Sequence, residues 1–411
     1  MKYSDYVDLK YEPSRDDLIA IFSIKPHSNV SMKVAAGAVA AESSTGTWDE
    51  VLTEKEYVKK YPAKVFSIKD DIIKVAYPLE LFEPGNIPNL LSSIAGNIFG
   101  MKIVRRIKLL DVIFPKKYVK KFKGPKYGIS GIRKMLRVKK RPLLGTIIKP
   151  KLGLKADDHA RVAYEAWTGG CDLVKDDENL TSQGFNKFED RLKKTLKMLN
   201  KAEKETGERK GYLINITAET DEMIRRAELV EKNDGIYVMV DIITVGWAAL
   251  QTLRNQGFNL IIHAHRAGHA AFTRSKTHGI SMLVIAKIAR LIGVDQLHTG
   301  TGELGKMKGE ETKKINNFLT SEFFGLREVF PVASGGLHPG IVDLLIEKLG
   351  NNIVIQAGGG IHAHPKGTFA GAKAMRQAIE AVMKNEKLEE YAKTKKELAE
   401  ALKKWGRRVF E

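Results

Sequence analysis

The chain has 411 residues, of which 43% are hydrophobic and 28% charged, as in an ordinary globular protein. This length exceeds one typical hydrophobic core and suits two domains. Residues 1–13 are polar and no apolar run is long enough for a bilayer, so we expect neither a signal peptide nor a membrane partner. The single cysteine, Cys171, excludes an internal disulfide and predicts a reducing, cytoplasmic location.

The formal net charge is +19, from 68 Lys and Arg against 49 Asp and Glu. Such an excess favours an anionic partner, either nucleic acid or a phosphorylated metabolite. The basic residues are spread along the chain, with one dense run over Lys116–Lys123 that is typical of a solvated face or a linker. No zinc knuckle or RNA-binding motif accompanies the run, so we expect no nucleic-acid partner.

Residues 1–125 mix two kinds of segment without a regular order, which predicts a separate α+β domain. Its strand-like runs are Leu18–Ile24, Val65–Ile68 and Asp71–Ala76, and its helical patterns are Lys33–Ala41 and Asn86–Phe99. The basic stretch Lys116–Lys126, which contains Gly124-Pro125, is the expected linker to the next domain.

Residues 126–411 are dominated by short apolar runs that alternate with amphipathic stretches, the pattern of βα units. Eight parallel strands, each followed by a helix, close into a (β/α)₈ TIM barrel, so the predicted fold class is α/β with the smaller α+β domain in front. A helical tail is expected over Lys366–Trp405. The eight strand-like runs are Leu143–Pro150, Cys171–Glu178, Tyr212–Ala218, Gly235–Ile243, Asn259–Arg266, Asp295–Gly300, Phe330–Gly336 and Asn352–Gly360.

Nearly every one of these runs ends in polar or glycine residues, and active sites of TIM barrels form at the carboxyl ends of the strands. Glycine clusters end the last two runs, at Ser334-Gly335-Gly336 and Gly358-Gly359-Gly360. Tight turns alone would explain one such cluster but explain two adjacent clusters poorly. Strands seven and eight commonly supply a phosphate site, which the clusters therefore predict.

The second run ends in Lys175-Asp176-Asp177-Glu178. Neighbouring carboxylates at a strand end can bind a hard cation such as Mg²⁺, although an acidic cluster after a strand also serves as a helix N-cap. Taken alone, the motif leaves both interpretations open. A lysine in a metal site would have to lose or invert its charge, and carbamylation by CO₂ is one way to do so.

The first run ends in Lys149-Pro150-Lys151. These lysines would stabilise enolate charge or transfer protons at the barrel mouth, unless they are simply solvated.

On the fifth run His263 and His265 share one face, because side chains two apart point the same way. Together with Arg266 and His269 they suit proton transfer and phosphate binding, whereas a lone histidine is more often a packed core residue.

His298 is followed by a glycine-rich loop that ends in Lys306, the composition of a lid that delivers a cation over a bound substrate, although such loops are also simply flexible. From the residues alone we infer a Mg²⁺-dependent barrel enzyme that acts on a phosphorylated sugar. Chemistry at a carbon beside a carbonyl would fit, with the metal stabilising an enediolate.

Together the motifs resemble the RuBisCO large chain over roughly residues 10–385, and its archaeal type III group most closely, which is often linked to nucleotide salvage such as AMP metabolism. The segments that carry the resemblance are Gly145–Leu154, Gly169–Asp172, Lys175–Asn179, His263–His269, Ser334–Gly336, Gly358–Gly360, Ala41–Trp48 and Gly96-Asn97.

The resemblance implies a ribulose-1,5-bisphosphate carboxylase/oxygenase that uses CO₂ or O₂ and gives two molecules of 3-phosphoglycerate on carboxylation. Lys175, carbamylated by an activator CO₂, would bind one Mg²⁺ per active site with Asp177 and Glu178, and would abstract the C3 proton. Lys149 would assist enolisation and protonate the product carbanion, helped by Lys151 and His265. Lys306 would close over the site.

The resemblance also implies two phosphate sites, one on Arg266, His298 and Ser334 and the other on glycines and residues of the amino-terminal domain. Glu42, Thr47, Trp48 and Asn97 reach the barrel of a partner subunit in that family, so a homodimer or a multiple of dimers is expected. The implied substrate-binding residues are Lys151, Arg266, His298, Ser334, Gly335, Gly336, Gly358, Gly359, Glu42, Thr47, Trp48 and Asn97.

One departure is a lid that is a residue longer than in plant-type chains and carries Glu303. The main alternative is a RuBisCO-like enolase or isomerase that acts on another phosphosugar in sulfur salvage. Those relatives typically lack several of the residues that bind the second phosphate or the carboxylate, whereas Glu42, Asn97 and Lys306 are all present here. A non-enzymatic nucleic-acid-binding protein would leave the polar strand ends unexplained.

Overall fold

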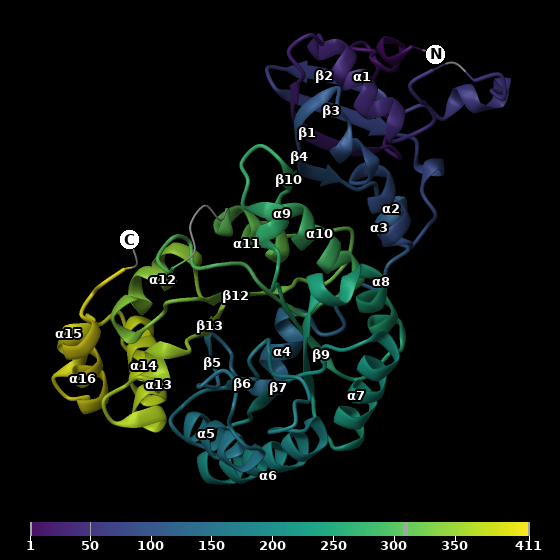
Figure 1. The fold of residues 1–411 in the computed structure, drawn as a ribbon. Coiled ribbons are helices and arrows are strands. Elements are labelled where there is room, and N and C mark those ends of the chain that lie inside the picture. Colours follow the sequence, from purple (N-terminus) through teal and green to yellow (C-terminus); the bar gives the residue numbers. More distant parts are fainter. Residues whose placement is uncertain (1, 50, 307–310, 410–411) are drawn as a thin grey trace. The chain divides into compact units, whose positions relative to one another are not determined.

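The structure is a computed structural model that describes residues 2–49, 51–306 and 311–409. The chain forms two compact units, residues 1–123 with 268–292 and residues 124–267 with 293–411 (Figure 1). Among the described helices, none combines the length and the apolar character needed to span a bilayer.

The first unit is built on a mixed sheet with the strand order β10-β4-β1-β3-β2. Its central strand β1 pairs antiparallel with β3 and β4, and β10 pairs parallel with β4. The bounds in this unit are β1 Leu18–Pro26, α1 Met32–Glu42, β2 Lys64–Lys69, β3 Ile72–Tyr77, α2 Ile87–Ile94, β4 Val104–Ile113, α3 Lys116–Val119, α9 Ala270–Thr273, β10 Gly279–Ile280 and α10 Met282–Ile292.

The basic run that was predicted as a solvated face or linker contributes to the core of the first unit. Its lysines are exposed, but Tyr118, Val119 and Phe122 are buried, and the Tyr118 ring stacks on Phe114 with centroids 5.8 Å apart. The linker prediction for Lys116–Lys126 is therefore wrong over most of its length, because three apolar side chains share one face of the basic stretch.

The second unit is a closed barrel in which eight parallel strands pair in the order β11-β12-β13-β5-β6-β7-β8-β9 among the described residues. The strands are β5 Leu143–Ile147, β6 Leu173–Lys175, β7 Gly211–Asn215, β8 Tyr237–Asp241, β9 Ile261–His265, β11 Gln296–His298, β12 Phe330–Ser334 and β13 Val354–Gln356. Seven of them lie within their predicted runs, and β7 begins at Gly211, one residue before the run predicted from Tyr212. The predicted barrel is confirmed.

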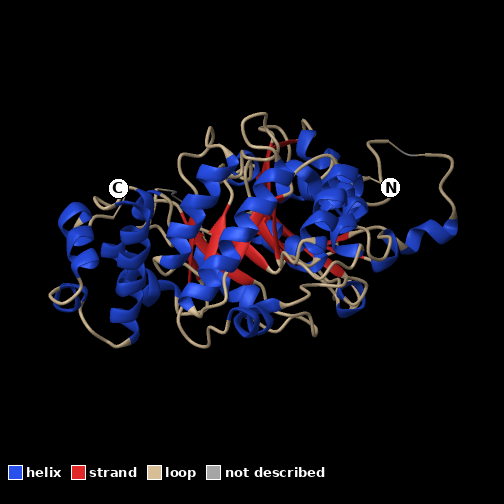
Figure 2. Cartoon of the chain, turned by 90° about the horizontal axis from the view of Figure 1, so that it is seen from below, coloured by secondary structure: helices blue, strands red, loops and turns tan. Residues whose placement is uncertain are grey.

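Helices enclose these strands, as the blue layer around the red strands in Figure 2 shows. The helices of this unit are α4 Gly128–Leu136, α5 Ala156–Thr168, α6 Phe188–Thr206, α7 Thr220–Lys232, α8 Ile242–Asn255, α11 Thr312–Thr320, α12 Val342–Leu349, α13 Gly359–His362, α14 Gly367–Met383, α15 Leu388–Ala392 and α16 Lys396–Trp405. The last three confirm the predicted helical tail.

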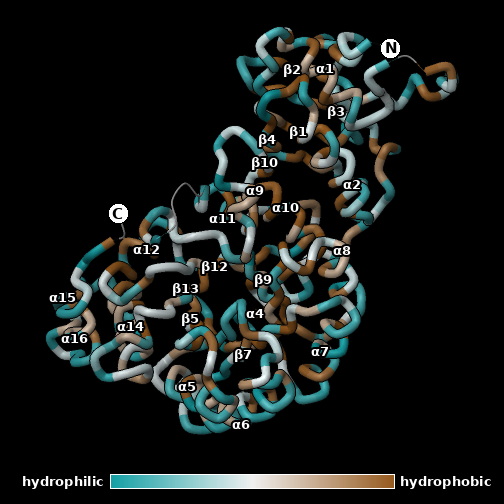
Figure 3. The backbone as a smooth tube through the Cα atoms, viewed as in Figure 1, coloured by the Kyte–Doolittle hydropathy of each residue, from teal (hydrophilic) through white to brown (hydrophobic). Residues whose placement is uncertain are grey.

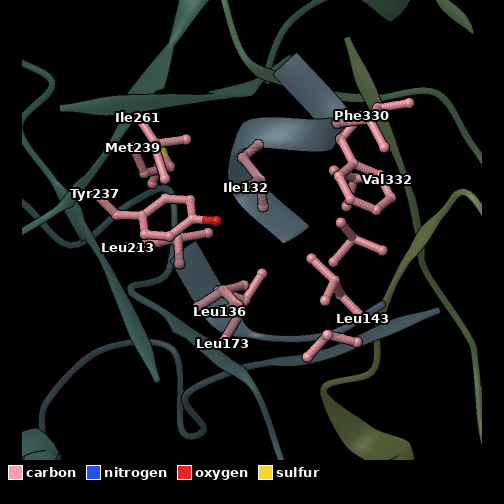
Figure 4. Packing of buried hydrophobic residues seen from close by; sticks show 13 residues of the cluster. Ile132, Leu136, Leu143, Leu173, Leu213, Tyr237, Met239, Ile261, Phe330 and Val332 are labelled. Atoms are coloured by element: carbon pink, nitrogen blue, oxygen red, sulfur yellow. The ribbon is translucent and has the colours of Figure 1, made fainter. Parts of the chain in front are cut away.

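Apolar side chains fill the barrel at the amino-terminal ends of its strands (Figure 4). Leu173, Leu213 and Phe330 point inward there, and Ile132 and Leu136 of α4 pack against them as a plug. Each large aliphatic side chain buried in this way stabilises the fold by about 1.5–3 kcal/mol. The plug fills the interior at this end of the barrel with apolar side chains.

The outer helices are amphipathic, with teal along much of α6 and brown along β9 in Figure 3. In α6, Phe188, Leu192 and Leu199 are buried while lysines cover the opposite face. Gly207 ends the helix in the left-handed conformation, with φ of 67°, which glycine adopts at little cost. The chain then turns back into β7, and this repeated return aligns the carboxyl ends of the strands.

Candidate functional site

Polar side chains gather where the barrel strands end. Lys149 and Lys151 follow β5, Lys175 ends β6 and is followed by Asp177 and Glu178, and the other candidates end β9, β11, β12 and β13 or follow them directly. Because all these strands run parallel in one barrel, their carboxyl ends lie at one mouth. The residues predicted for chemistry in this unit therefore come from one end of it.

Lysines and carboxylates of β5 and β6 contact one another at this mouth. Lys149 Nζ lies 2.7 Å from Asp177 Oδ2, and Lys151 Nζ lies 3.9 Å from Glu178 Oε1. The fully buried Lys175 donates to the Asp176 carbonyl at 2.6 Å and lies 3.4 Å from Glu178 Oε2. Each of these lysines therefore has an acidic neighbour within reach.

Asp176 turns away from the mouth and anchors the loop that carries its neighbours. Its buried carboxylate accepts from His159 Nε2 at 2.9 Å, the Tyr212 hydroxyl at 2.7 Å, Arg191 Nε at 3.0 Å and the Asn215 backbone N–H at 3.0 Å. Burial alone would raise the pKa of Asp176, but the Arg191 charge and the His159 hydrogen bond hold it below its usual range. The loop is thus fixed by a satisfied buried network.

Glu178 is ionised in this setting. Burial would raise its pKa, but the nearby charges of Lys175 and His265 outweigh burial and lower the pKa to about 2. The side-chain amide of Asn215 donates to the Glu178 carbonyl at 3.0 Å, which helps to fix the loop backbone.

His265 is oriented by an aspartate and directed towards Glu178. Its Nδ1 lies 2.6 Å from Asp241 Oδ1 at the end of β8, so Nδ1–H donates to that carboxylate. Its Nε2 lies 3.7 Å from Glu178 Oε2 and faces the carboxylate cluster. A histidine held this way presents one defined nitrogen for proton exchange.

His263 and His298 are hydrogen-bonded to each other, and the His298 ring also contacts the ring of His265. Their Nε2 atoms are 2.9 Å apart, while His298 Nδ1 lies 2.8 Å from Ser334 Oγ. Burial lowers the pKa of His263 and of His298 well below the usual range, so both rings are neutral. Arg266, a predicted ligand that directly follows β9, is also buried.

The predicted lid meets the loop after β12. Lys306 is exposed, and its backbone N–H donates to the Gly335 carbonyl at 3.4 Å. Glu303 lies 3.8 Å from Lys348 of α12, a weak exposed ion pair at the base of the lid. Residues 307–310 lie outside the described residues.

The two glycine clusters are shaped by their backbone. Gly335 and Gly336 have φ of 105° and 82°, a conformation that other residues rarely adopt. A Cβ at Gly358 would lie 3.1 Å from Lys149 Cε, so a side chain there would crowd the lysine. Gly359 begins the short helix α13 directly after β13.

The four predicted residues of the first unit lie outside the barrel unit. Glu42 ends α1 and accepts from the Tyr3 hydroxyl at 2.7 Å. Trp48 is 80% exposed, and Thr47 is half-buried beside it. Asn97 is exposed on a short 3₁₀ helix, Asn97–Gly100.

The described residues hold no cluster of three or more His, Cys, Asp and Glu with the geometry of a metal site. Asp177 and Glu178 offer two carboxylates, and the group beside them is the amine of Lys175. This donor set fits Mg²⁺ if Lys175 becomes an oxygen donor, since Mg²⁺ prefers oxygen ligands.

Comparison with known proteins decides the family. The model of the ribulose bisphosphate carboxylase large chain, catalytic domain, matches residues 128–405, and that of its N-terminal domain matches residues 5–118. The chain belongs to this family. A ribulose bisphosphate carboxylase from Methanocaldococcus jannaschii is 52% identical, covering 98% of this chain and 100% of the relative. One from Pyrococcus furiosus is 54% identical, covering 98% of each.

Solved structures of the family agree with this result. The octameric ribulose-1,5-bisphosphate carboxylase/oxygenase from Pyrococcus horikoshii, crystallised with sulfate, matches with a TM-score of 0.96 at 50% identity, covering 99% of this chain and 97% of that one. The dimeric archaeal RuBisCO from Hyperthermus butylicus matches with a TM-score of 0.93 at 46% identity, covering 99% and 100%. The predicted resemblance to the RuBisCO large chain and its archaeal members is confirmed.

Several residues that shape the site were missed or given no role from the sequence. Asp241 was counted among the polar ends of the predicted runs, near the end of Gly235–Ile243, but was given no role. Asn215, Gln296 and His362 were not singled out. Asp241 had a usable signal, a carboxylate at the end of the strand before the His263-Ala264-His265 motif. The others are ordinary polar residues whose partners lie on different strands, so no local pattern marks them.

Proposed function

We propose that this chain is a ribulose-1,5-bisphosphate carboxylase that yields two molecules of 3-phosphoglycerate, with O₂ as the competing gaseous substrate. The observation that carries the proposal is the cluster of Lys149, Lys175, Asp177, Glu178 and His265 at one barrel mouth, in a chain of this family. Acid, base and cation-binding groups stand there within a few ångströms, as enolisation beside a carbonyl requires.

The proposal includes one Mg²⁺ per active site, held by Asp177, Glu178 and a carbamylated Lys175. Reaction of the neutral Lys175 amine with CO₂ forms an N–C bond and releases one proton, which turns the amine into an anionic oxygen donor. When bound, the cation would polarise the substrate carbonyl and stabilise negative charge on the enediolate. Its charge would also keep the carboxylates of Asp177 and Glu178 ionised.

The remaining steps are assigned to side chains at the barrel mouth. The carbamate on Lys175 would remove the C3 proton, and His265, held by Asp241, would exchange protons with the substrate hydroxyls. Lys149, with Lys151 beside it, would assist enolisation and deliver a proton to the carbanion that forms on cleavage. Lys306 would stabilise the new carboxylate from the lid.

The two phosphates are assigned to the ends of different strands. Arg266, His298 and Ser334 would bind one phosphate, and Gly336, Gly358 and Gly359 would donate backbone N–H groups to the other, beside Gly335. The exposed Trp48 supports a role for Thr47 and Trp48, with Glu42 and Asn97, in the site of a partner subunit. We therefore propose a homodimer or a multiple of dimers, the states named for two of the related structures.

We further propose a domain boundary near residue 125, a cytoplasmic location and a role in the salvage of nucleotides such as AMP. Support for the location is the single buried Cys171, whose thiol needs no oxidising compartment.

The experiment that tests the function is fixation of labelled bicarbonate that depends on ribulose bisphosphate. The protein is first incubated anaerobically with Mg²⁺ and CO₂. Label in acid-stable 3-phosphoglycerate that vanishes without Mg²⁺ is the expected result. Folded, dimeric protein that fixes no label would overturn the proposal in favour of the RuBisCO-like enolase or isomerase acting on another phosphosugar.

A further inference from the structure

A chain of hydrogen bonds crosses four neighbouring strands of the barrel, β8, β9, β11 and β12. Ser334 Oγ lies 2.8 Å from His298 Nδ1, and His298 Nε2 lies 2.9 Å from His263 Nε2. His263 Nδ1 lies 2.8 Å from Gln296 Oε1, and the Gln296 amide nitrogen lies 3.5 Å from the Tyr237 hydroxyl. All members except Ser334 are buried, so the chain leads from the barrel core to the mouth.

The protons along this chain are linked, because each neutral imidazole carries one N–H and one acceptor nitrogen. In one arrangement the Gln296 oxygen accepts from His263 Nδ1–H, which leaves His263 Nε2 as an acceptor. His298 Nε2–H then donates to it, and His298 Nδ1 accepts from the Ser334 hydroxyl. The position of one proton therefore fixes all the others.

The opposite arrangement is equally complete. If the Gln296 amide turns over and donates to His263 Nδ1, every bond in the chain reverses, and His298 Nδ1–H donates to Ser334 Oγ. The hydroxyl proton of Ser334 is then free to point at an anion in the barrel mouth. A glutamine suits the buried end of such a chain because its amide offers both a donor and an acceptor.

We propose that His263 and Gln296 are positioning residues for a phosphate group bound at Ser334. They hold the ring plane and the tautomer of His298, both of whose ring nitrogens are already bonded. His298 then orients the Ser334 hydroxyl towards the anion that Arg266, His298 and Ser334 are proposed to bind. The inference rests on the proposed function for the identity of the substrate as a bisphosphate, but its anion test does not.

The first test compares two replacements of His263. In His263→Leu the bond to His298 is lost, and we expect the KM for ribulose bisphosphate to rise about tenfold with kcat changed less than about threefold. His263→Gln keeps an amide that can donate to or accept from His298, so its KM should return to within about threefold of wild type. Thermal unfolding of both variants checks that they are folded.

A matched control is His364→Gln. His364 is also buried in this unit, but its Nε2 bonds to the Glu397 carbonyl near the carboxyl-terminal helices. Its KM should stay at the wild-type value. Equal KM increases in His263→Leu and His263→Gln would contradict the positioning role of His263, because loss of the hydrogen bond to His298 would then not be the cause.

The second test uses inorganic phosphate as the probe, measured by calorimetric titration of the full-length protein. His263→Leu should weaken phosphate binding about tenfold in the wild-type background but less than about twofold in a Ser334→Ala background. The same loss in both backgrounds, or an unchanged affinity in His263→Leu, would overturn the inference. A protein in which His263 and Ser334 are coupled in phosphate binding, but which fixes no labelled bicarbonate, would support the positioning role and contradict the proposed function.

Discussion

Lys149 Nζ and Asp177 Oδ2 form a 2.7 Å ion pair that joins the ends of the adjacent strands β5 and β6. The Asp177 side chain is 1% exposed and the Lys149 side chain 29%, so the pair is sheltered from water on the carboxylate side. Lys149, which is proposed to deliver a proton, is thus paired with Asp177, which is proposed to bind Mg²⁺. Cation binding at Asp177 and the freedom of Lys149 are therefore coupled.

Lys149→Met should reduce kcat for carboxylation by about 10²–10⁴, the usual contribution of a positioned proton donor. The variant also removes the Lys149 ammonium group, which competes with Mg²⁺ for Asp177. The Mg²⁺ concentration that gives half-maximal protection against thermal unfolding should therefore fall. Lys193→Met, an exposed lysine on α6, is the control and should change neither quantity. A kcat within threefold of wild type would remove Lys149 from the mechanism.

Lys175→Ala should abolish carboxylation and the Mg²⁺-dependent retention of one labelled CO₂ per chain. Lys210→Met is a matched control, because Lys210 is equally buried but bonds Glu208 and the Cys171 carbonyl at the start of β7. That variant should retain the label. Near-native turnover in Lys175→Ala, or loss of label in both variants, would contradict the assignment of the carbamate to Lys175.

Lys306→Met should block carboxylation while partly sparing exchange of the C3 proton, since the lid lysine is assigned only to the later step. Exchange of that proton with labelled water is measured beside fixation of labelled bicarbonate. Lys313→Met on the exposed face of α11 serves as the control. An equal loss of both activities would show that Lys306 is also needed for enolisation.

Most of the barrel could be predicted from the sequence because its strands are buried apolar runs with polar ends. Where prediction and structure differ, the polar ends are the reason: Lys175 closes β6, a strand of three residues, and Asp176 to Glu178 belong to the loop. Strand β4 was missed because Arg105 and Arg106 interrupt its apolar pattern, although Ile107, Leu109 and Val112 are buried. Consecutive charged residues such as these interrupt the apolar pattern from which a strand is predicted.

The gathering of the candidate residues at one barrel mouth was predictable, but the contacts between them were not. Lys149 and His265 are candidates because they lie at the carboxyl ends of strands, and all these ends meet at one mouth of a parallel barrel. No such rule shows that Asp176 turns to Arg191 of the outer helix α6 while Asp177 turns to Lys149. The packing of residues 268–292 with the first unit is equally invisible in the sequence, because it depends on contacts far apart along the chain.

Asp176→Asn should destabilise the protein by about 3–5 kcal/mol, because Arg191 would keep a buried charge without its partner. The free energy of unfolding in urea measures the loss, and carboxylation should fall with it as the loop loosens. Asp190→Asn is the matched control, since this exposed carboxylate on α6 pairs only with Lys194 among the ion pairs of the described residues. Its effect should stay below about 0.5 kcal/mol. Similar losses in the two variants would contradict a special role for the Asp176 network.

His362 should make stability depend on pH between about 6.5 and 4. Burial lowers its pKa to about 4, and its ring bonds Thr146 Oγ1 and Thr368 Oγ1, each at 3.0 Å. Between these pH values the unfolded chain binds a proton that the folded chain excludes, so the free energy of unfolding should fall as pH drops through this window. The expected loss is about 2–3 kcal/mol at pH 4.

His362→Gln isolates this contribution, because the amide can bond the same hydroxyls but does not titrate in this range. The free energy of unfolding of both proteins is measured from pH 7 to pH 4, and the difference between them is taken at each pH. Wild type should lose stability relative to the variant as the pH falls, since only wild type must exclude a proton from a buried ring. Parallel curves would show that the pKa of His362 is the same in the folded and unfolded chains, which would contradict the prediction.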